Sequence, residues 1–458
     1  MKALFSILLS TAMTFHTATL LVAENPTLIL QSARVASADS TRTAHGVRFA
    51  DQFPPPSITN AIADAGKEPV IVFVPCGTYY DNISITRSNV SIIGGGRDCT
   101  NVAPRSDKLP VIAIDATSSG VTGINHVNIS DLSLHNPQRY NVDGLVIKGR
   151  LDIDQPNDRH SIRRVYISGF RNGVSILGRM IWSEFDFVFS EANTANGWYI
   201  SSPAVQHDNL FVHIRSAYNG QYGVYWNNSN RRLLSAANSW INPNIEYNGI
   251  KYSIDNCAGF YATGTTSGSI TDGYFEGNCT ASTDGRGADI RLTGSYAREF
   301  NITNSYFSSQ INIYNDAKLT TGEYRGNFFF GRTSLRIATD HPDSRLVIGQ
   351  NRDTAEHSFM LDRSGNSHVE FLNSLVFSAS GKQLQKSHIT TGRAKLLSSG
   401  KLTVNLAAGS AFESSQSYVC TVQDVSSPRV ITYSPESGSK FTVTGAANDR
   451  FTYLCAGS

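Results

Sequence analysis

The stretch SITDGYFEGN (269–278) has the pattern of a short β-strand, a polar turn and a second strand, and it closes with Glu two positions before Asn. The stretch NITNSYFSSQ (301–310) follows the same pattern of strand and turn. FSEAN (189–193) and NIEYN (244–248) also close with Glu two positions before Asn. Short strands and polar turns that recur along a chain predict a fold built from copies of one β unit.

The length of the unit selects among the repeat architectures. Counted between the closing residues Asn193, Asn219, Asn248 and Asn278, the steps are 26, 29 and 30 residues. Helical repeats need apolar residues at 3.6 spacing, leucine-rich repeats need a regular leucine frame, and propeller blades are longer and carry four strands. None of these patterns is present, so we predict an all-β fold, a parallel β-helix whose coils stack at about 4.8 Å. The closing asparagines would then bond from coil to coil.

Composition fits this fold class. Apolar residues make up 40% of the chain and charged residues only 17%, so that Ser, Thr, Asn and Gly carry much of the polarity. The formal net charge is +2, which gives no basic face for nucleic acid. No segment after the N-terminus is long and apolar enough to span a bilayer. We therefore expect neither a nucleic-acid partner nor a membrane partner.

The chain divides into segments of different character. Lys2 precedes an apolar run that ends at Ala23, which is typical of a secretory signal peptide. A secreted, extracellular or periplasmic protein is expected on this basis. The predicted boundaries are a signal peptide at 1–23, a polar arm at 24–45, the β-helix at 46–331, a less regular β continuation at 332–397, and a small β-sandwich-like module at 398–458.

One helix is predicted at 57–65, ahead of the first coils. Ser57 can cap it, Ile58, Ala61 and Ile62 share one face, and Gly66 ends it. The open end of a solenoid exposes core and unpaired strand edges. We expect the helix to cover that end.

The six cysteines form three local pairs, Cys76 with Cys99, Cys257 with Cys279, and Cys420 with Cys455. An even number of cysteines in an exported chain predicts disulfides. The first two separations, 23 and 22 residues, are close to one coil, as the short reach of a disulfide requires. The sequence has no CxxC motif and no clustered histidines, so metal binding by these cysteines is the weaker alternative.

Equivalent positions of successive coils form a column on the surface, and the closing asparagines align one that is rich in carboxylates. It contains Glu191, Ala217, Glu246, Glu276 and then Ser308. Neighbouring coils place Glu246 about 5 Å from Glu276, and two coils place Glu191 about 10 Å from Glu246. These spacings bracket those of retaining and inverting glycosidases, roughly 5–5.5 Å and 6.5–9.5 Å. We predict Glu246 and Glu276 as the catalytic pair, while solvent-facing or turn-capping side chains are the plain alternative.

Further candidates lie in the same coils. Glu184, Asp186 and Asp272 are second-choice catalytic acids, and Glu184 and Asp186 should face outward because they alternate with apolar residues. Aromatic side chains are candidates for sugar binding because they can stack on the apolar face of a sugar, and Trp198 and Trp226, which follow Asn-Gly turns, are the best of them. Polar side chains are candidates as well. The predicted binding residues are Trp198, Trp226, Trp240, Tyr247, Arg215 and His207.

No cofactor is expected from these residues, with one candidate exception. LDIDQPNDRH (151–160) clusters Asp152, Asp154 and Asp158, which are oxygen ligands suited to calcium. The spacing is not that of an EF-hand, so a solvated turn is the simpler interpretation.

The residues FVPCGTYYDNISITRSNVSIIGGG (73–96), preceded by a helix and followed by coils, resemble the pectin-lyase-like superfamily, in its pectate lyase 3 or glycoside-hydrolase-28-related branch. The resemblance covers roughly 45–330. It implies a right-handed parallel β-helix acting on a polysaccharide, and β-helices of this kind often assemble as homotrimers. The polygalacturonase motifs NTD, DD, GHG and RIK are absent.

The sequence thus predicts a secreted polysaccharide-degrading glycoside hydrolase that uses two carboxylates. Two alternatives stay open. One is a polysaccharide lyase that eliminates at a uronate, for which Arg215, His207, His213, Lys251 and Tyr247 are available. The other is a non-catalytic carbohydrate-binding or adhesion protein with a tailspike-like shape.

Overall fold

The computed structural model describes residues 46–457, except 119–122, 151–156, 203–205, 229–234, 251–256, 281–286, 340, 354–356, 362–367, 372–374, 379–387, 407–411, 413, 417 and 427–429. The predicted signal peptide and polar arm lie outside the described residues. Within the described part of the chain, no helix is long and apolar enough to cross a membrane.

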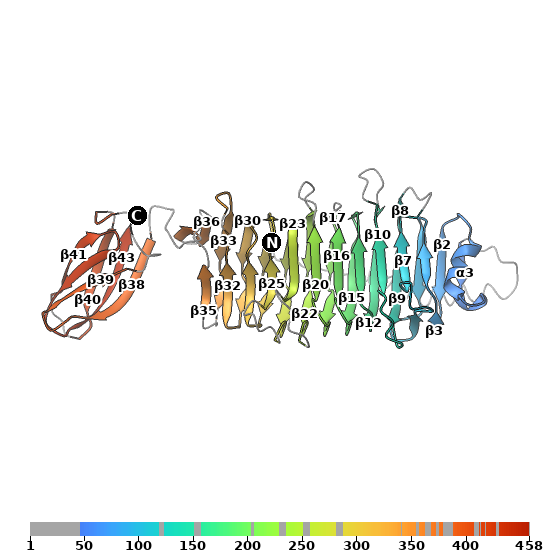
Figure 1. Ribbon diagram of the computed structural model, residues 1–458, viewed down its shortest axis with the longest axis horizontal. Helices are drawn as coiled ribbons and strands as arrows, with labels where there is room; N and C mark the ends of the chain where they lie inside the picture. The colour runs from blue at the N-terminus through green and yellow to red at the C-terminus, as the bar shows by residue number, and fades with distance from the viewer. Residues whose placement is uncertain are drawn as a thin grey trace, which may run out of the picture.

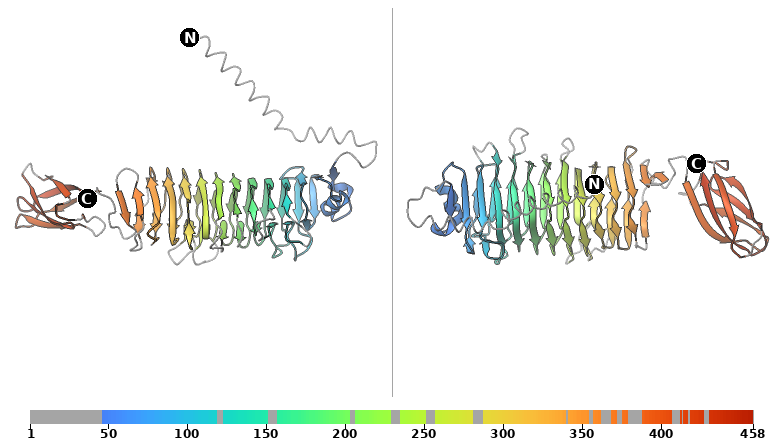
Figure 2. Two further views of the ribbon diagram at one scale, coloured as in Figure 1. Left: turned by 90° about the horizontal axis from the view of Figure 1, so that it is seen from above. Right: turned by 180° about the vertical axis from the view of Figure 1, so that it is seen from behind.

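Most of the chain is wound into stacked coils, as Figures 1 and 2 show, and this confirms the predicted parallel β-helix. Its first sheet contains β1 (Val47–Phe49), β2 (Val70–Val74), β3 (Gly77–Tyr80), β5 (Val90–Gly94), β6 (Thr100–Ala103), β9 (Asn128–His135), β12 (Ser161–Ser168), β15 (Glu184–Glu191), β18 (Leu210–Val212), β19 (Arg215–Ala217), β21 (Ser235–Ile241), β22 (Asn244–Glu246), β23 (Ala258–Thr271), β24 (Tyr274–Glu276), β26 (Tyr296–Ala297), β27 (Asn301–Thr303), β28 (Tyr306–Phe307), β30 (Leu319–Arg325), β31 (Phe328–Phe329), β33 (Arg345–Gly349), β34 (Arg352–Asp353), β36 (His368–Phe371) and β37 (Leu375–Ser378).

Two further parallel sheets complete the coils. The second contains β4 (Ile83–Ile85), β7 (Ile112–Asp115), β10 (Leu145–Lys148), β13 (Val174–Leu177), β16 (Trp198–Ser202), β20 (Val224–Asn228), the first half of β23, β25 (Ala288–Leu292), β29 (Ile311–Asn315), β32 (Thr333–Ile337) and β35 (His357–Leu361). The third is short and contains β8 (Ile124–Asn125), β11 (Asn157–Asp158), β14 (Met180–Ile181) and β17 (Gln206–His207).

A buried row of asparagines fixes how the coils stack. The side-chain amide of Asn193 donates to Asn219 at 2.9 Å, that of Asn219 donates to Asn248 at 2.8 Å, and that of Asn248 donates to Asn278 at 3.0 Å. All four side chains are at most 2% exposed. A buried amide needs a partner, so a coil that slipped by one residue would leave unpaired groups in the interior.

Glycines make room for this row. A Cβ at Gly197 would lie 2.7 Å from the amide nitrogen of Asn219, and one at Gly223 would lie 2.7 Å from that of Asn248. Each glycine immediately precedes a strand of the second sheet, and its carbonyl accepts a hydrogen bond from Ser190 or Ser216. The repeated Ser, Asn and Gly therefore form one interlocking unit per coil.

The N-terminal end is covered by α3 (Ser57–Asp64), which follows the short 3-10 helix η1 (Ala50–Gln52) and buries Ile58, Ala61 and Ile62 (Figure 1). This confirms the predicted helix. The expected cap at Ser57 is wrong, because its hydroxyl bonds instead to the carbonyl of Phe53. The buried carboxylate of Asp81 caps the helix from the coil below, accepting hydrogen bonds from the backbone amides of the first helical turn.

The coils continue beyond residue 331, since β32, β33, β34 and β35 still pair in parallel. At the other end of the rod lie two antiparallel sheets with their own apolar core (Figure 1). One contains β38 (His388–Lys395), β40 (Tyr418–Asp424) and β43 (Arg450–Gly457), and the other β39 (Lys401–Asn405), β41 (Thr432–Ser437) and β42 (Lys440–Thr444). Strand β38 thus starts ten residues before the expected boundary at 398.

The three predicted disulfides are confirmed. The Cα atoms lie 4.8 Å apart for Cys76–Cys99, 5.7 Å for Cys257–Cys279 and 3.9 Å for Cys420–Cys455. Three disulfides are characteristic of proteins outside the cytoplasm.

Asn248→Ala is expected to lower the free energy of unfolding by about 3 kcal/mol, because it leaves donors and acceptors of two neighbouring coils buried and unpaired. Asn128→Ala is the matched control, since this exposed amide bonds only to Ser91 across the surface and should change stability by less than about 0.5 kcal/mol. Urea unfolding midpoints measure both. Equal midpoints for the two variants would contradict a structural role for the asparagine row.

The asparagine row ends at a buried carboxylate, Asp289, which is 0% exposed and accepts hydrogen bonds from Asn278, Ser309 and Asn312. Burial raises the pKa of Asp289 from its ordinary value to about 6, although these hydrogen bonds oppose the shift. Because the folded-state pKa is raised, the protonated form favours folding, and stability is lost as the pH rises from about 4 to about 6.

Asp289→Asn should remove this pH dependence. Between pH 4 and pH 7 the wild type should lose up to about 3 kcal/mol relative to the variant. Urea unfolding at several pH values measures the difference. Parallel stability profiles for the two proteins would show that Asp289 does not titrate in this range.

Candidate functional site

The predicted carboxylate column is present in the predicted register. Glu191 lies beside Ala217, Ala217 beside Glu246, and Glu246 beside Glu276, at the carboxyl ends of β15, β19, β22 and β24. Ser308 follows, since its amide bonds to the carbonyl of Phe275 in the coil before it. The inward neighbours at these strand ends, such as Ile245 and Phe275, are fully buried, so the acids lie on the outer face.

Arg215 joins two of these acids. Its Nη1 lies 2.9 Å from Oε1 of Glu191, while its Nη2 and Nε lie 2.6 Å and 3.1 Å from Oε1 of Glu246. Arg215 stands two residues before Ala217 on the same strand and therefore faces the same way. The methyl group of Ala217 leaves space between the two acids, and the guanidinium group binds both across it.

Glu191 lies in an environment that favours its protonated form. Its side chain is 14% exposed, and burial raises the pKa of its carboxyl, although the charge of Arg215 opposes the shift. The nearby charge of Glu246 raises the pKa further. Oε1 is close to Arg215 but accepts no well-aligned hydrogen bond, and Oε2 lies 3.5 Å from the hydroxyl of Tyr166.

Glu276 is held by different partners from the other two acids. Tyr274 and Tyr247 both donate hydrogen bonds to it. The hydrogen bond to Glu276 raises the pKa of Tyr274, and the charge of Glu276 raises that of Tyr247. Glu246 and Glu276 are adjacent in the column as predicted, but the side chains that converge on one cation are Glu191 and Glu246.

The second-choice acids lie elsewhere on the coils. Glu184 and Asp186 face outward, as expected, but they stand at the start of β15, with Glu184 paired to Arg163 and Asp186 near His213. Asp272 is exposed at the turn after β23. None of the three contacts the carboxylate column.

The tryptophans predicted to bind sugar are buried, which corrects that prediction. Trp198 is 0% exposed, Trp240 1% and Trp226 2%. Trp198 occupies the inward position of Val174 and Val224 in neighbouring coils. The three indoles pack inside the β-helix and cannot contact a glycan on its surface.

Of the other predicted binding residues, Arg215 and Tyr247 lie at the carboxylate column, whereas His207 does not. His207 pairs with Asp208 at 2.6 Å on the third sheet. Sequence reasoning missed Tyr166 and Arg97, whose charge acts on Glu191. Arg97 comes from the turn after β5 and lies 4.8 Å above the ring of Phe189, a contact that no local sequence pattern signals.

The candidate calcium loop is only partly described. Asp152 and Asp154 lie outside the described residues, and Lys251, a candidate for the lyase alternative, does too. Asp158 is 2% exposed in the third sheet. Among the described residues, no group of three His, Cys, Asp or Glu side chains could hold a metal ion.

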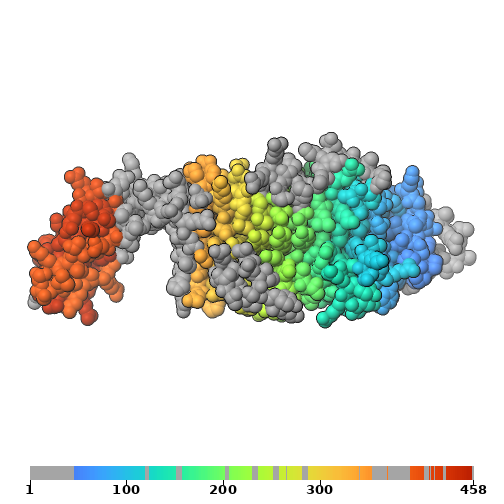
Figure 3. Space-filling view, viewed as in Figure 1, coloured from blue at the N-terminus to red at the C-terminus, as the bar shows by residue number. Residues whose placement is uncertain are grey.

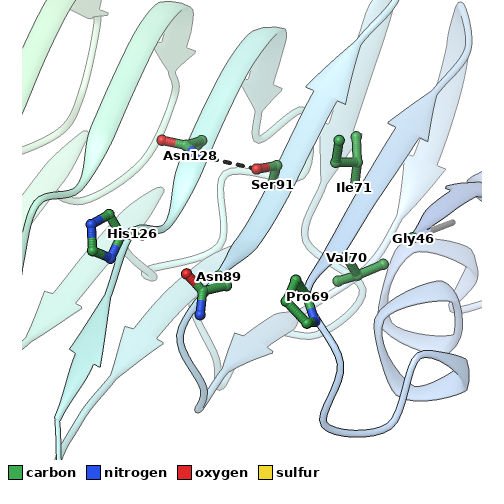
Figure 4. Close-up of a pocket in the computed structure, with 8 residues that line it drawn as sticks. All are labelled: Gly46, Pro69, Val70, Ile71, Asn89, Ser91, His126 and Asn128. Atoms are coloured by element: carbon green, nitrogen blue, oxygen red, sulfur yellow. Dashed lines mark hydrogen bonds between the residues drawn. The ribbon is translucent and has the colours of Figure 1, made fainter.

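Figure 3 shows one face of the molecule as a long rod of coils. One cavity of about 360 Å³ lies at the N-terminal coils, where Asn128 donates to Ser91 (Figure 4). It is lined by Gly46, Pro69, Val70, Ile71, Asn89, Ser91, His126 and Asn128. A groove on the outer face of β38, β43 and β40 is lined by Gly392, Arg393, Thr421, Gln423, Thr452, Tyr453 and Leu454.

No protein-family model and no curated protein matches the sequence. Among solved structures, the chain is similar to full-length tailspike protein 2 from the Escherichia coli O157:H7 bacteriophage CAB120, with 12% identity and a TM-score of 0.51 over 82% of this chain and 54% of that chain. It is also similar to the A-module of the Azotobacter vinelandii mannuronan C-5 epimerase AlgE4, with 13% identity and a TM-score of 0.47 over 66% of this chain and 94% of that chain.

A third similar structure is the tailspike protein gp49 of the Acinetobacter baumannii bacteriophage Fri1, a capsular polysaccharide depolymerase, with 13% identity and a TM-score of 0.43 over 91% of this chain and 87% of that chain. At such low identity, similarity establishes the fold alone. The chain has the right-handed parallel β-helix fold.

Arg215→Gln should raise the pKa of Glu191 further, because the cation that opposes the burial effect is removed. Carbon-13 NMR of the glutamate carboxyls, assigned with Glu191→Gln, measures this pKa. Arg325→Gln, which removes an exposed pair with Glu323 in a later coil, is the control and should leave Glu191 unchanged. An unchanged or lower pKa in Arg215→Gln would show that Arg215 does not set the charge of this site.

Proposed function

We propose that this protein is a polysaccharide-active enzyme that hydrolyses glycosidic bonds with Glu191 and Glu246. The observation that carries the proposal is the convergence of these two carboxylates on Arg215, on the outer face of a rigid sheet. Because both acids contact one guanidinium group, their oxygens lie within about 8 Å of each other, which is compatible with the 5–9.5 Å span of glycosidase carboxyl pairs.

The two acids have unequal environments, and this assigns their roles. Burial raises the pKa of Glu191, so Glu191 is the general acid that donates its proton to the glycosidic oxygen of the leaving sugar. Glu246, bound by two nitrogens of Arg215, is the base that takes a proton from the attacking water, or the nucleophile. With Glu246 as the base, the water oxygen bonds to the anomeric carbon as the bond to the leaving oxygen breaks. With Glu246 as the nucleophile, its carboxylate oxygen first displaces the leaving oxygen, and water then cleaves the resulting glycosyl ester.

Glu276 lies one coil beyond Glu246 and is held by two phenol groups. We assign Glu276 the role of positioning a sugar hydroxyl next to Glu246. We therefore favour Glu191 with Glu246 over the pair first predicted from the sequence. Glu246 and Glu276 lack a shared cation, whereas Glu191 and Glu246 have one.

Hydrolysis is favoured over elimination by the state of Arg215. A lyase needs a cation to neutralise the uronate carboxylate of its substrate, but both ends of this guanidinium group already bind acids of the protein. The alternative of a non-catalytic binder places no demand on the pKa of Glu191. The fold shared with a phage depolymerase and an epimerase is consistent with a carbohydrate substrate and leaves the reaction open.

A panel of dextran, xylan, polygalacturonate and alginate distinguishes these functions. Hydrolysis releases reducing ends without new near-ultraviolet absorbance, elimination produces both, and a binder produces neither. Activity should fall as the pH rises through the pKa of Glu191, because its protonated form is the acid.

Glu191→Gln and Glu246→Gln should each lower kcat by about 10²–10⁴-fold with folding intact, since each removes proton transfer or nucleophilic attack. Glu276→Gln should cost less and act mainly on KM. Glu323→Gln, an exposed acid of a later coil, is the control and should retain wild-type activity. Wild-type kcat in both Glu191→Gln and Glu246→Gln would reject the proposed acid pair.

A further inference from the structure

A second column runs beside the carboxylates, one residue later in each coil. It contains Ala192, Tyr218, Tyr247 and Gly277, whose φ angles are 53°, 57°, 54° and 60°. The amides of Ala192, Tyr218 and Tyr247 each bond to the strand-end carbonyl of the next coil. These residues therefore occupy the same left-handed corner of successive coils, and their side chains follow one line along the surface.

The ring of Tyr247 is covered on both faces. Tyr218 stacks on one face, with ring centroids 5.3 Å apart and an angle of 5° between the planes. Gly277 lies under the other, since a Cβ there would be 2.7 Å from the ring of Tyr247. The corner beside Glu276 is thus occupied by the phenol of the preceding coil.

The corner beside Glu191 is open. Tyr218 is 47% exposed, and the ring face that does not contact Tyr247 is turned toward the coil of Ala192. Ala192 is itself exposed and offers only a methyl group. One coil further, the equivalent residue is Gly169, because Ser168 pairs with Glu191. Small side chains in two successive coils therefore form a ledge below the free face of Tyr218.

This ledge adjoins the proposed general acid. Glu191 immediately precedes Ala192, and its Oε1 has no well-aligned hydrogen-bond donor. The hydroxyl of Tyr166 lies 3.5 Å from its Oε2, and the charge of Arg97 also acts on Glu191. A flat ring face, a small-residue floor and a half-buried carboxyl in one place match a pyranose ring, which presents an apolar C–H face and an acceptor oxygen at its edge.

We infer that Tyr218 is the stacking platform for the reacting sugar, with the pyranose ring held over Ala192 and Gly169 and its glycosidic oxygen toward Glu191. The inference rests on the proposed function and deepens it. It places the bond to be cleaved at the coils of Glu191 and Glu246, because the platform position beside Glu276 is taken by Tyr247.

The test uses the chain's own geometry. Ala192→Tyr places a third phenol at a corner that already accommodates tyrosine twice with the same φ, so the variant is expected to fold and to cover the free face of Tyr218. Tyr218→Ala removes the platform, and Tyr218→Phe retains the ring. Tyr225→Ala is the matched control, because Tyr225 belongs to a stacked tyrosine row on the second sheet.

Two readouts separate this inference from the proposed function. The first is retardation of each variant in native gels containing dextran, xylan, polygalacturonate or alginate, and the second is kcat and KM on the polysaccharide that is cleaved. Ala192→Tyr and Tyr218→Ala should weaken retention and raise KM at least about tenfold, whereas Tyr218→Phe and Tyr225→Ala should match the wild type.

The outcomes are distinct. Cleavage that is unaffected in both Ala192→Tyr and Tyr218→Ala overturns the platform and leaves the acid pair standing. Retention without cleavage, lost in those two variants alone, supports the platform and overturns the hydrolase. Loss of binding in Tyr225→Ala as well, or no retention of the wild type by any polysaccharide, overturns the platform.

Discussion

The structure depends on hydrogen bonding between buried side-chain amides of successive coils. Asn193, Asn219, Asn248 and Asn278 form one continuous row, and each amide donates to the next. Because a buried amide is costly when unpaired, the row permits a single register between coils. Over these coils the glycines, the inward apolar residues and the outward acids keep the same register.

That constraint explains why the sequence predicted the fold and the column well. The closing asparagines recur because each must reach the next, so their spacing measures the length of a coil. Glu246 and Glu276 could be placed side by side from it, although loops of unequal length separate them. The sequence gives no comparable signal for Arg215 as a bridge, since its contacts cross two coils and depend on the small side chain of Ala217.

The tryptophans show where sequence reasoning failed. An aromatic residue after an Asn-Gly turn suits either face of a strand, and the interpretation chose the outer one. The informative comparison is between strand starts: Gly173–Val174, Gly197–Trp198, Gly223–Val224 and Gly259–Phe260 share one pattern, with glycine against the asparagine row and an inward apolar residue next. Trp198 occupies that inward position, and the large volume of its side chain does not indicate whether it faces inward or outward.

The same geometry joins rigidity to chemistry at the candidate site. Each acid of the column ends a strand, and the next residue turns the corner with positive φ. Backbone hydrogen bonds to the coils on both sides hold each acid and its corner residue in place. The acids and corner residues of neighbouring coils are therefore one coil spacing apart. Glu191 lies in a partly buried position that opposes its charge, and Arg215 offsets part of that cost. The raised pKa of Glu191 therefore follows from its burial between coils whose register is fixed.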